Sequence, residues 1–268
     1  MNNFVKIAWK DCLSHQVWRA FESGWPDVNA HFVWGLTSAS RKAILHCMAT
    51  GQDWYYVDVG YLTKPITRYP IPKIHDIYDT YFRIVKGNLH TIRGAVGDGK
   101  RISLLESQGI DVNFKGWYTG DTKHILLAPS SQTVTYEVNG ISQEEWIKQT
   151  TEEIRKYTDR EIKVRNKPRP GNEWWDTDIK DDLFEAKCLV TNMSLAAVDA
   201  VFNKVPVICH TRNVVSPISS RDLKYVEKPI RPGHKTVNNW LKMVVENQFT
   251  LPEIESGYAY KIFKNQLV

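Results

Sequence analysis

Short apolar stretches alternate with helix-like stretches through the second half of the chain, and this alternation constrains the fold more than any other feature. The predicted strands are ILLAP (125–129), EIKVRNK (161–167), CLVTN (188–192) and PVICH (206–210). The predicted helices are residues 142–158, a short one near DDLFEAK and residues 194–204, and SSQTVTYEVNG (130–140) is predicted as a polar loop. Strands that alternate with helices form a parallel sheet covered by helices.

The first half alternates in the same way. Predicted strands span residues 4–9, 30–36, 54–62 and 78–86, and predicted helices span 15–24, 40–51 and 101–110. The run TKPITRYPIP (63–72) has three prolines and is predicted as a loop. We therefore expect an α/β protein with two Rossmann-like lobes, residues 1–122 and 123–250, and a C-terminal helix over 251–268 that returns to the first lobe. The ligand site is expected in the interlobe crevice, where strand C-termini face it.

Bulk properties limit the class of protein. The chain has 268 residues, 42% of them hydrophobic, and its apolar stretches are all shorter than the ~20 residues that span a bilayer. Its start lacks the pattern of a signal peptide, so we expect a soluble, cytoplasmic protein without a membrane partner. The four cysteines show no CxxC spacing, which predicts reduced, buried thiols and no zinc site. The eight histidines show neither HxH nor HExxH spacing, so no metal is expected.

The stretch GAVGDGKR (Gly94 to Arg101) matches the GxxxxGK spacing of a P-loop. A P-loop requires a preceding buried strand and a Ser or Thr after its lysine, to bind Mg²⁺. Here that position is Arg101, and the preceding GNLHTIR is too polar for a central parallel strand. The stretch is therefore predicted to be a solvated, Gly-rich turn.

A phosphate site is predicted instead in VTNMSLAAVDAVFNKVPVICH. A predicted strand ends at Asn192 and a predicted helix begins at Ser194, so the hydroxyl and backbone N–H groups there can bind an anion. Asp199, five residues further on, could accept hydrogen bonds from a ribose diol. Taken alone, the same residues also fit a plain helix cap followed by an ordinary exposed aspartate.

This order of strand, N-x-S-x-x-x-x-D-A helix and PVI strand resembles the nucleotide-sugar half of GT-B glycosyltransferases, which implies a GT-B-like fold. By that resemblance Ser194 contacts the diphosphate and Asp199 the ribose. The stretch APSS (128–131) resembles the family's second phosphate loop, and RNKPRP (165–170) carries cations where similar enzymes keep them near the pyrophosphate. Asn192 and His210 are included because they lie at the ends of predicted strands. The predicted donor-binding residues are Ser130, Ser131, Lys167, Arg169, Asn192, Ser194, Asp199 and His210.

WYYVDVGYL, YFRIVKGNLH and GWYTGDTKHILLAPSS resemble small phage and bacterial glycosyltransferases, some of which act on hydroxymethylated pyrimidines in phage DNA. Within this resemblance Asp58 is either the general base that deprotonates an acceptor hydroxyl or a cap of the turn at Gly60. Arg83 either holds a substrate or pairs with a carboxylate such as Asp58. The predicted acceptor-binding residues are Tyr61, Arg68, Arg83, Asn88 and Arg101.

Residues 64–124 hold 10 basic and 6 acidic groups interleaved with aromatic residues, which is compatible with nucleic acid and also common on ordinary enzymes. The leading hypothesis is transfer of a sugar from a nucleotide-diphosphate donor, such as a UDP-sugar, to a 5-hydroxymethylpyrimidine in double-stranded phage DNA. The expected location is then the host cytoplasm. One alternative is a polysaccharide or lipid-linked-sugar glycosyltransferase, and another is a non-catalytic DNA-binding protein with a degenerate nucleotide fold. The sequence sets neither the sugar nor the oligomeric state.

Overall fold

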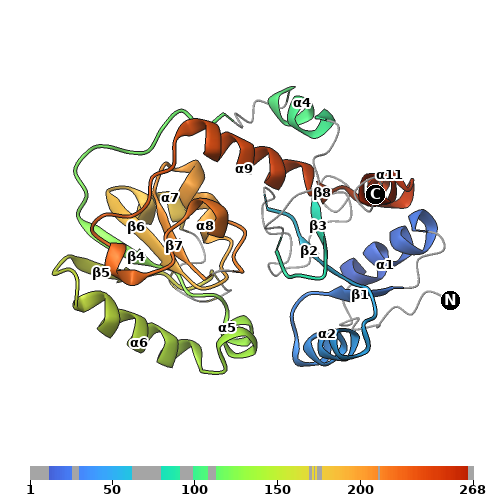
Figure 1. The fold of residues 1–268 in the computed structure, drawn as a ribbon, viewed down its shortest axis with the longest axis horizontal. Coiled ribbons are helices and arrows are strands. Elements are labelled where there is room, and N and C mark those ends of the chain that lie inside the picture. Colours follow the sequence, from blue (N-terminus) through green and yellow to red (C-terminus); the bar gives the residue numbers. More distant parts are fainter. Residues whose placement is uncertain are drawn as a thin grey trace. The chain divides into compact units, whose positions relative to one another are not determined.

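The computed structural model describes residues 12–25, 30–61, 80–90, 99–107, 113–168, 171, 173, 177–210 and 212–264 (Figure 1). The chain divides into two compact units. The first consists of Met1–Val112 with Lys242–Val268, and the second of Asn113–Leu241. The sequence places the corresponding boundaries at residues 122 and 250. The predicted strand over residues 4–9 lies outside the described residues.

The sheet of the second unit is parallel throughout, as the alternating pattern predicts. Among the described residues it has the order β5-β4-β6-β7. The strands are β4 (His124–Leu127), β5 (Glu161–Val164), β6 (Ala186–Thr191) and β7 (Val207–Cys209). The chain leaves β4 for β5 on one side and then crosses to β6 on the other. Strand order therefore reverses next to β4, and this is where α/β sheets bind ligands.

Strands β4, β6 and β7 of this sheet are largely buried, whereas the edge strand β5 is exposed or half-buried. The described helices of this unit are α5 (Gln132–Asn139), α6 (Gln143–Arg155), α7 (Ile179–Leu183), α8 (Ala196–Phe202), two short 3₁₀ turns (Ser216–Ile218 and Leu223–Tyr225) and α9 (His234–Glu246), which continues into the first unit from Lys242. The predicted start of α6 is confirmed, since the Ser142 side chain accepts a hydrogen bond from the Glu145 N–H. One face of the sheet packs Ile125, Leu127 and Val190 against Ile154 of α6.

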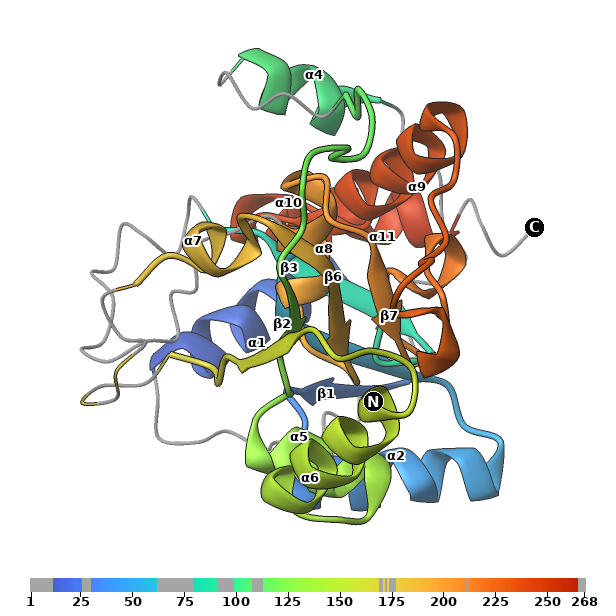
Figure 2. The same ribbon diagram turned by 90° about the vertical axis from the view of Figure 1, so that its left-hand side faces the viewer.

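The predicted polar loop over residues 130–140 is wrong, because residues 132–139 form α5. The helix ends at Gly140, which adopts the left-handed conformation (φ 75°) that glycine tolerates best. The sequence of α5 reads as a loop because several of its residues are polar. One of them, the buried Thr135, donates a hydrogen bond from its hydroxyl to the Ser130 carbonyl at 3.2 Å. Helices α5 and α6 lie side by side in both views (Figures 1 and 2).

The sheet of the first unit is mixed, and here the predicted parallel sheet is only partly correct. Its described strands are β1 (His31–Trp34), β2 (Trp54–Val59), β3 (Phe82–Lys86) and β8 (Gln248–Phe249), in the order β1-β2-β3-β8. Strands β1 and β2 are parallel, whereas β3 is antiparallel to both of its neighbours. The antiparallel place of β3 follows from its pairing with both β2 and β8, which no local pattern in the sequence records.

Helices pack on both faces of this sheet. Those of the first unit are α1 (Cys12–Gly24), α2 (Ser38–Thr50), α4 (Lys100–Ser107), α10 (Leu251–Glu255) and α11 (Tyr258–Lys264). An aromatic core that includes Phe21, Trp25, Tyr55 and Phe263 lies between α1, α11 and one face. The other face places Tyr56 against Cys47 of α2.

Three cysteines in the described part of the chain are free and buried, as predicted: Cys47, Cys188 and Cys209. Burial raises the pKa of both Cys188 and Cys209 to about 12. None of the described helices is long and apolar enough to cross a membrane.

Candidate functional site

The carboxyl edge of the second sheet collects most of the predicted donor-binding residues. Because its strands are parallel, the segments that follow them emerge at the same edge. Residues 128–131 follow β4, residues 165–168 follow β5, residues 192–194 follow β6, and His210 follows β7. The structure brings the first and third of these segments into direct contact.

Asn192 joins the two central segments. Its Oδ1 accepts hydrogen bonds from the Ser130 N–H at 2.9 Å and from the Met193 N–H at 2.8 Å. Its Nδ2 donates to Thr135 Oγ1 at 3.2 Å and to Asn139 Oδ1 at 3.0 Å. Both lone pairs and both N–H groups of the carboxamide are thus used within the protein. Asn192 positions the loops, and a direct contact with a donor stays a prediction.

The two serines after β4 have different surroundings. Ser130 is buried, and its Oγ accepts a hydrogen bond from the Met193 N–H at 3.1 Å. The Ser130 carbonyl also accepts from Gln143 Nε2 at 2.6 Å, which ties the start of α6 to this loop. Ser131 is half-buried at the N-cap of α5, and its hydroxyl makes no capping bond. Of the two hydroxyls, that of Ser131 is the more accessible.

Ser194 lies where the β6 segment meets α8, which begins two residues later than predicted, at Ala196. The Ser194 N–H donates to Thr191 Oγ1 at 3.3 Å, and its Oγ accepts from the Ala196 N–H at 3.3 Å. Its carbonyl accepts from Asn213 Nδ2 at 3.2 Å. Asp199 is exposed in the first turn of α8. The roles predicted for Ser194 and Asp199 stay predictions.

The outer segments supply charge and a neutral imidazole. Lys167 is exposed, and Arg169 lies outside the described residues. His210 is half-buried, and its Nδ1 accepts a hydrogen bond from the Arg212 N–H at 3.2 Å. Burial, and then the charge of Arg212, lower the pKa of His210 from its usual value of 6.5. His210 is therefore uncharged at neutral pH.

Arg165 has a role at this edge that the sequence did not reveal. It is buried, forms an ion pair with Asp182 of α7, and donates from Nη2 to the Thr177 carbonyl at 3.0 Å. It thereby holds the segment around α7 to the end of β5. The DDL run of α7 was visible in the sequence, but no local signal paired its second aspartate with an arginine 17 positions earlier.

The first unit places Asp58 and Arg83 directly opposite each other on β2 and β3. Arg83 Nη2 lies 2.8 Å from Asp58 Oδ2, so the predicted alternative that Arg83 pairs with Asp58 is confirmed. The carboxylate also accepts from the Tyr56 hydroxyl at 2.7 Å and from the Val59 N–H at 2.8 Å. Burial, followed by the charge of Asp58, raises the pKa of Tyr56 well above its usual value. Tyr56 therefore acts as a hydrogen-bond donor here.

Gly60 continues the backbone pairing of β2 with the segment before β3, and the residues that would complete the predicted turn, from Leu62 on, lie outside the described residues. The Gly60 N–H donates to the Tyr81 carbonyl at 2.7 Å. A Cβ at this position would lie 2.8 Å from both that carbonyl and Gln248 Oε1. Glycine is needed here for close approach of neighbouring segments, because no side chain fits.

The other predicted acceptor residues that the structure describes contact groups of the first unit, and the Arg83 guanidinium lies 5.6 Å from the centre of the Tyr61 ring. Tyr61 is buried and its N–H donates to Gln248 Oε1 at 2.8 Å, and the Asn88 side chain accepts from the Leu89 N–H at 2.8 Å. Arg101 is buried, with an ion pair of 2.6 Å to Glu253 and its guanidinium over the Tyr81 ring. Its charge is therefore directed into the first unit and away from solvent. Arg68 lies outside the described residues.

The Gly-rich turn that resembled a P-loop is described only from Gly99 onward. Gly99 has a φ of 81°, and α4 begins at the exposed Lys100. Gly94 lies outside the described residues. The position of a Mg²⁺-binding hydroxyl in a P-loop is taken by the buried Arg101, as the sequence indicated.

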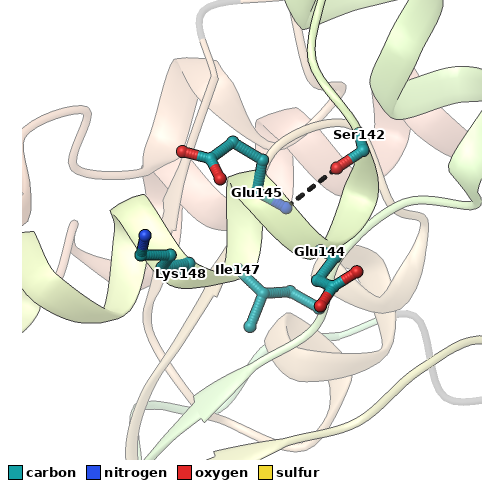
Figure 3. A pocket seen from close by; sticks show the side chains of 5 residues that line it. All are labelled: Ser142, Glu144, Glu145, Ile147 and Lys148. Carbon is teal, nitrogen blue, oxygen red and sulfur yellow. Dashed lines mark hydrogen bonds between the residues drawn. The ribbon is translucent and has the colours of Figure 1, made fainter.

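An open hollow at the start of α6 is lined by Ser142, Glu144, Glu145, Ile147 and Lys148 (Figure 3). The Ser142 hydroxyl already caps the helix there. Two carboxylates in the first turn disfavour a phosphate by repulsion. This hollow is therefore not the phosphate site.

Comparisons with known proteins give little further guidance. No protein-family model and no curated protein matches the chain. Two similar solved structures are both from Thermosulfurimonas dismutans. KpsC, described as a beta Kdo 2,4 transferase, is 14% identical with a TM-score of 0.47, over 82% of this chain and 80% of that one. KpsC described as a beta Kdo 2,7 transferase is 11% identical with a TM-score of 0.46, over 87% and 85%.

At such identities and TM-scores, function has to be inferred from the residues of this chain. Its carboxyl edge offers the hydroxyls of the half-buried Ser131 and Ser194 and the exposed cation of Lys167, which are groups that bind anions. Among the residues that the structure describes, no three His, Cys, Asp or Glu side chains gather in a way that could hold a metal ion.

Proposed function

We propose that this protein is a nucleotide-sugar-dependent glycosyltransferase whose second unit binds the nucleotide donor at the carboxyl edge of its parallel sheet. The observation that carries the proposal is the contact between the Asn192 side chain and the Ser130 N–H. It joins the segments after β4 and β6, beside the point where strand order reverses. A site held this firmly suits electrostatic catalysis, which depends on donors that are fixed before the reaction.

The roles in this proposal follow the chemistry of the side chains. Ser131 and Ser194 donate hydrogen bonds to the phosphates of the donor, and Lys167 and Arg169 stabilise the negative charge of the departing nucleotide. Asp199 accepts hydrogen bonds from the ribose. Asp58 of the first unit accepts the proton of the acceptor hydroxyl. The Asp58 side chain is 29% exposed, so one part of its carboxylate is accessible although Arg83 and Tyr56 hold it.

The acceptor that we propose is a saccharide hydroxyl. Of the basic residues predicted to bind the acceptor, Arg83 and Arg101 are buried against Asp58 and Glu253, and Arg68 lies outside the described residues. DNA is the alternative outcome. Binding to DNA would weaken steeply with added salt, because each phosphate contact releases counterions.

Nucleotide titration tests the donor site. Ser194→Ala and Asp199→Ala should each weaken nucleotide affinity by about 1–3 kcal/mol, because each removes a hydrogen-bond partner of the bound donor. Lys100→Ala in the first unit is the matched control and should bind like the parent protein. Equal affinities in all four proteins would remove the donor site from the second unit.

Turnover tests the reaction itself. We expect release of free nucleotide from one member of a donor panel that includes UDP-sugars and nucleotide-activated Kdo, in the presence of oligosaccharide. Release with hydroxymethylated DNA alone would instead identify the DNA acceptor. If the protein binds nucleotide and turns over no donor with any acceptor, the proposed enzyme function is wrong.

A further inference from the structure

Asn166 lies at the same carboxyl edge, two residues after the end of β5. Its carboxamide Oδ1 is buried and has no hydrogen-bond partner among the residues that the structure describes. The preceding residue, Arg165, directs its Nη groups to Asp182 and to the Thr177 carbonyl. The following residue, Lys167, is exposed.

A buried oxygen that accepts no hydrogen bond destabilises a folded protein, because it has lost its contact with water. Such groups are rare, and each one calls for an explanation. The contrast with Asn192 is informative, since that carboxamide makes four hydrogen bonds at the same edge of the sheet. Asn166 follows β5 at the carboxyl edge of the sheet and directly precedes the exposed Lys167, so a ligand at this edge can supply what the protein does not.

We propose that Asn166 is a specificity residue whose Oδ1 accepts a hydrogen bond from the nucleoside portion of the donor. This inference rests on the proposed function and names the part of the substrate that the residue contacts. An ionised phosphate has only acceptor oxygens and cannot satisfy another acceptor. The partner is therefore an O–H or N–H group, which the ribose and the base both carry.

Replacing Asn166 separates this role from a structural one. Asn166→Ala should leave the urea midpoint unchanged or raise it, because a buried unsatisfied oxygen disappears. The same variant should bind the tightest of UDP, CDP, ADP and GDP about 5- to 100-fold more weakly than the parent protein. A structural asparagine would give the opposite pair of results. A lower urea midpoint in Asn166→Ala overturns the proposal.

Two further arms identify the partner. Asn166→Asp keeps an acceptor oxygen but adds a charge that a phosphate repels, so it is compared with Asn166→Ala on the free nucleoside, which it should bind better. Weaker binding of the nucleoside by the aspartate variant than by Asn166→Ala would contradict the proposal. The 2′-deoxy and 3′-deoxy nucleotides separate ribose from base: if the missing hydroxyl is the partner, Asn166→Ala weakens binding of that analogue no further.

Asn203→Ala is the matched control. Asn203 lies at the C-cap of α8, where the chain has returned to the opposite edge of the sheet, and its carboxamide donates to the Asp199 carbonyl at 2.8 Å. Nucleotide affinity should not change in this variant. If the parent protein binds none of the four nucleotides, both the proposed function and this inference are wrong. If the parent binds and Asn166→Ala binds equally well, only the role of Asn166 is wrong.

Discussion

Three arginines of this protein are buried against carboxylates that stay partly accessible. The pairs are Arg83 with Asp58, Arg101 with Glu253 and Arg165 with Asp182. The arginine side chains are 3–6% exposed and the carboxylates 27–31%. Removing the carboxylate from such a pair leaves a buried charge without its partner, which costs more than the net worth of the pair. Each arginine therefore holds its segments in place.

The pair of Asp58 and Arg83 gives a prediction about stability. Asp58→Asn keeps the shape of the side chain and removes its charge, so the free energy of unfolding should fall by about 1–3 kcal/mol. Urea denaturation measures this. Asp53→Asn is the control, because Asp53 directly precedes β2 and forms a solvent-accessible ion pair with Lys86. Its effect on the free energy of unfolding should stay within about 0.5 kcal/mol. An unchanged midpoint in Asp58→Asn would contradict the anchoring role.

Asp58→Asn also distinguishes a structural role of Asp58 from a role as general base. If Asp58 is the general base of the proposed reaction, Asp58→Asn should lower transfer by roughly 10²–10⁴-fold at a temperature where the variant is fully folded. Full activity of the folded variant would leave the residue as an anchor for Arg83 alone.

His210 gives a prediction about pH. Its pKa is lowered in the folded protein by burial and then by Arg212, so below pH 6.5 the unfolded chain binds the proton more readily. The unfolded state then carries more protons, and the contribution of His210 to stability is lost as the pH falls. His210→Gln should therefore reduce the fall in the free energy of unfolding between pH 7 and pH 5. Parallel pH profiles in the two proteins would contradict this.

At the scale of elements, side-chain hydrogen bonds join the segments at the carboxyl edge of the second unit. The segment after β4, helix α5 and the segment after β6 meet at Asn192. Helix α6 joins them through Gln143. Loops tied to one another in this way lose little further conformational freedom when a ligand binds.

Asn192→Ala should destabilise the protein by about 2–5 kcal/mol, because the N–H groups of Ser130 and Met193 lose a shared buried acceptor. Thr135→Val keeps the shape at the same junction and removes fewer bonds, so its loss should be about 1 kcal/mol. Thermal and urea unfolding of both variants test the ranking. Equal losses would mean that Asn192 is not the residue that joins the segments.

At the scale of the whole molecule, the second unit is one continuous piece of chain, whereas the first needs both termini. Helices α10 and α1 pack together in the first unit, and there a Cβ on Gly24 would lie 1.7 Å from the Ile254 carbonyl. Folding of the first unit therefore requires residues from both ends of the sequence, but the second unit has its own core.

A fragment of residues 113–241 should fold alone, with a cooperative thermal transition. Its affinity for nucleotide should be within a few-fold of that of the whole chain if all donor contacts come from the second unit. Calorimetry and nucleotide titration of the fragment test both statements. The segment 1–112 alone should show no cooperative transition, because it lacks β8, α10 and α11.

The sequence by itself determined the second unit well. Its central strands β4 and β6 are apolar and α6 begins at a recognisable cap, so the alternating pattern along the chain predicts a parallel sheet. The edge at which Ser130, Asn192 and Ser194 gather follows from that parallel order. The sequence also ruled out a P-loop at Gly99, since the residue types there do not suit one.

Only the tertiary structure decided the rest, because the deciding contacts join residues far apart in the chain. The antiparallel place of β3 depends on pairing with β8, and the burial of Arg101 depends on Glu253, 152 positions later. Helix α5 is polar because its side chains bond to loops instead of packing in a core. Local periodicity records which faces of an element are apolar, but it does not record which distant charge or loop an element will meet.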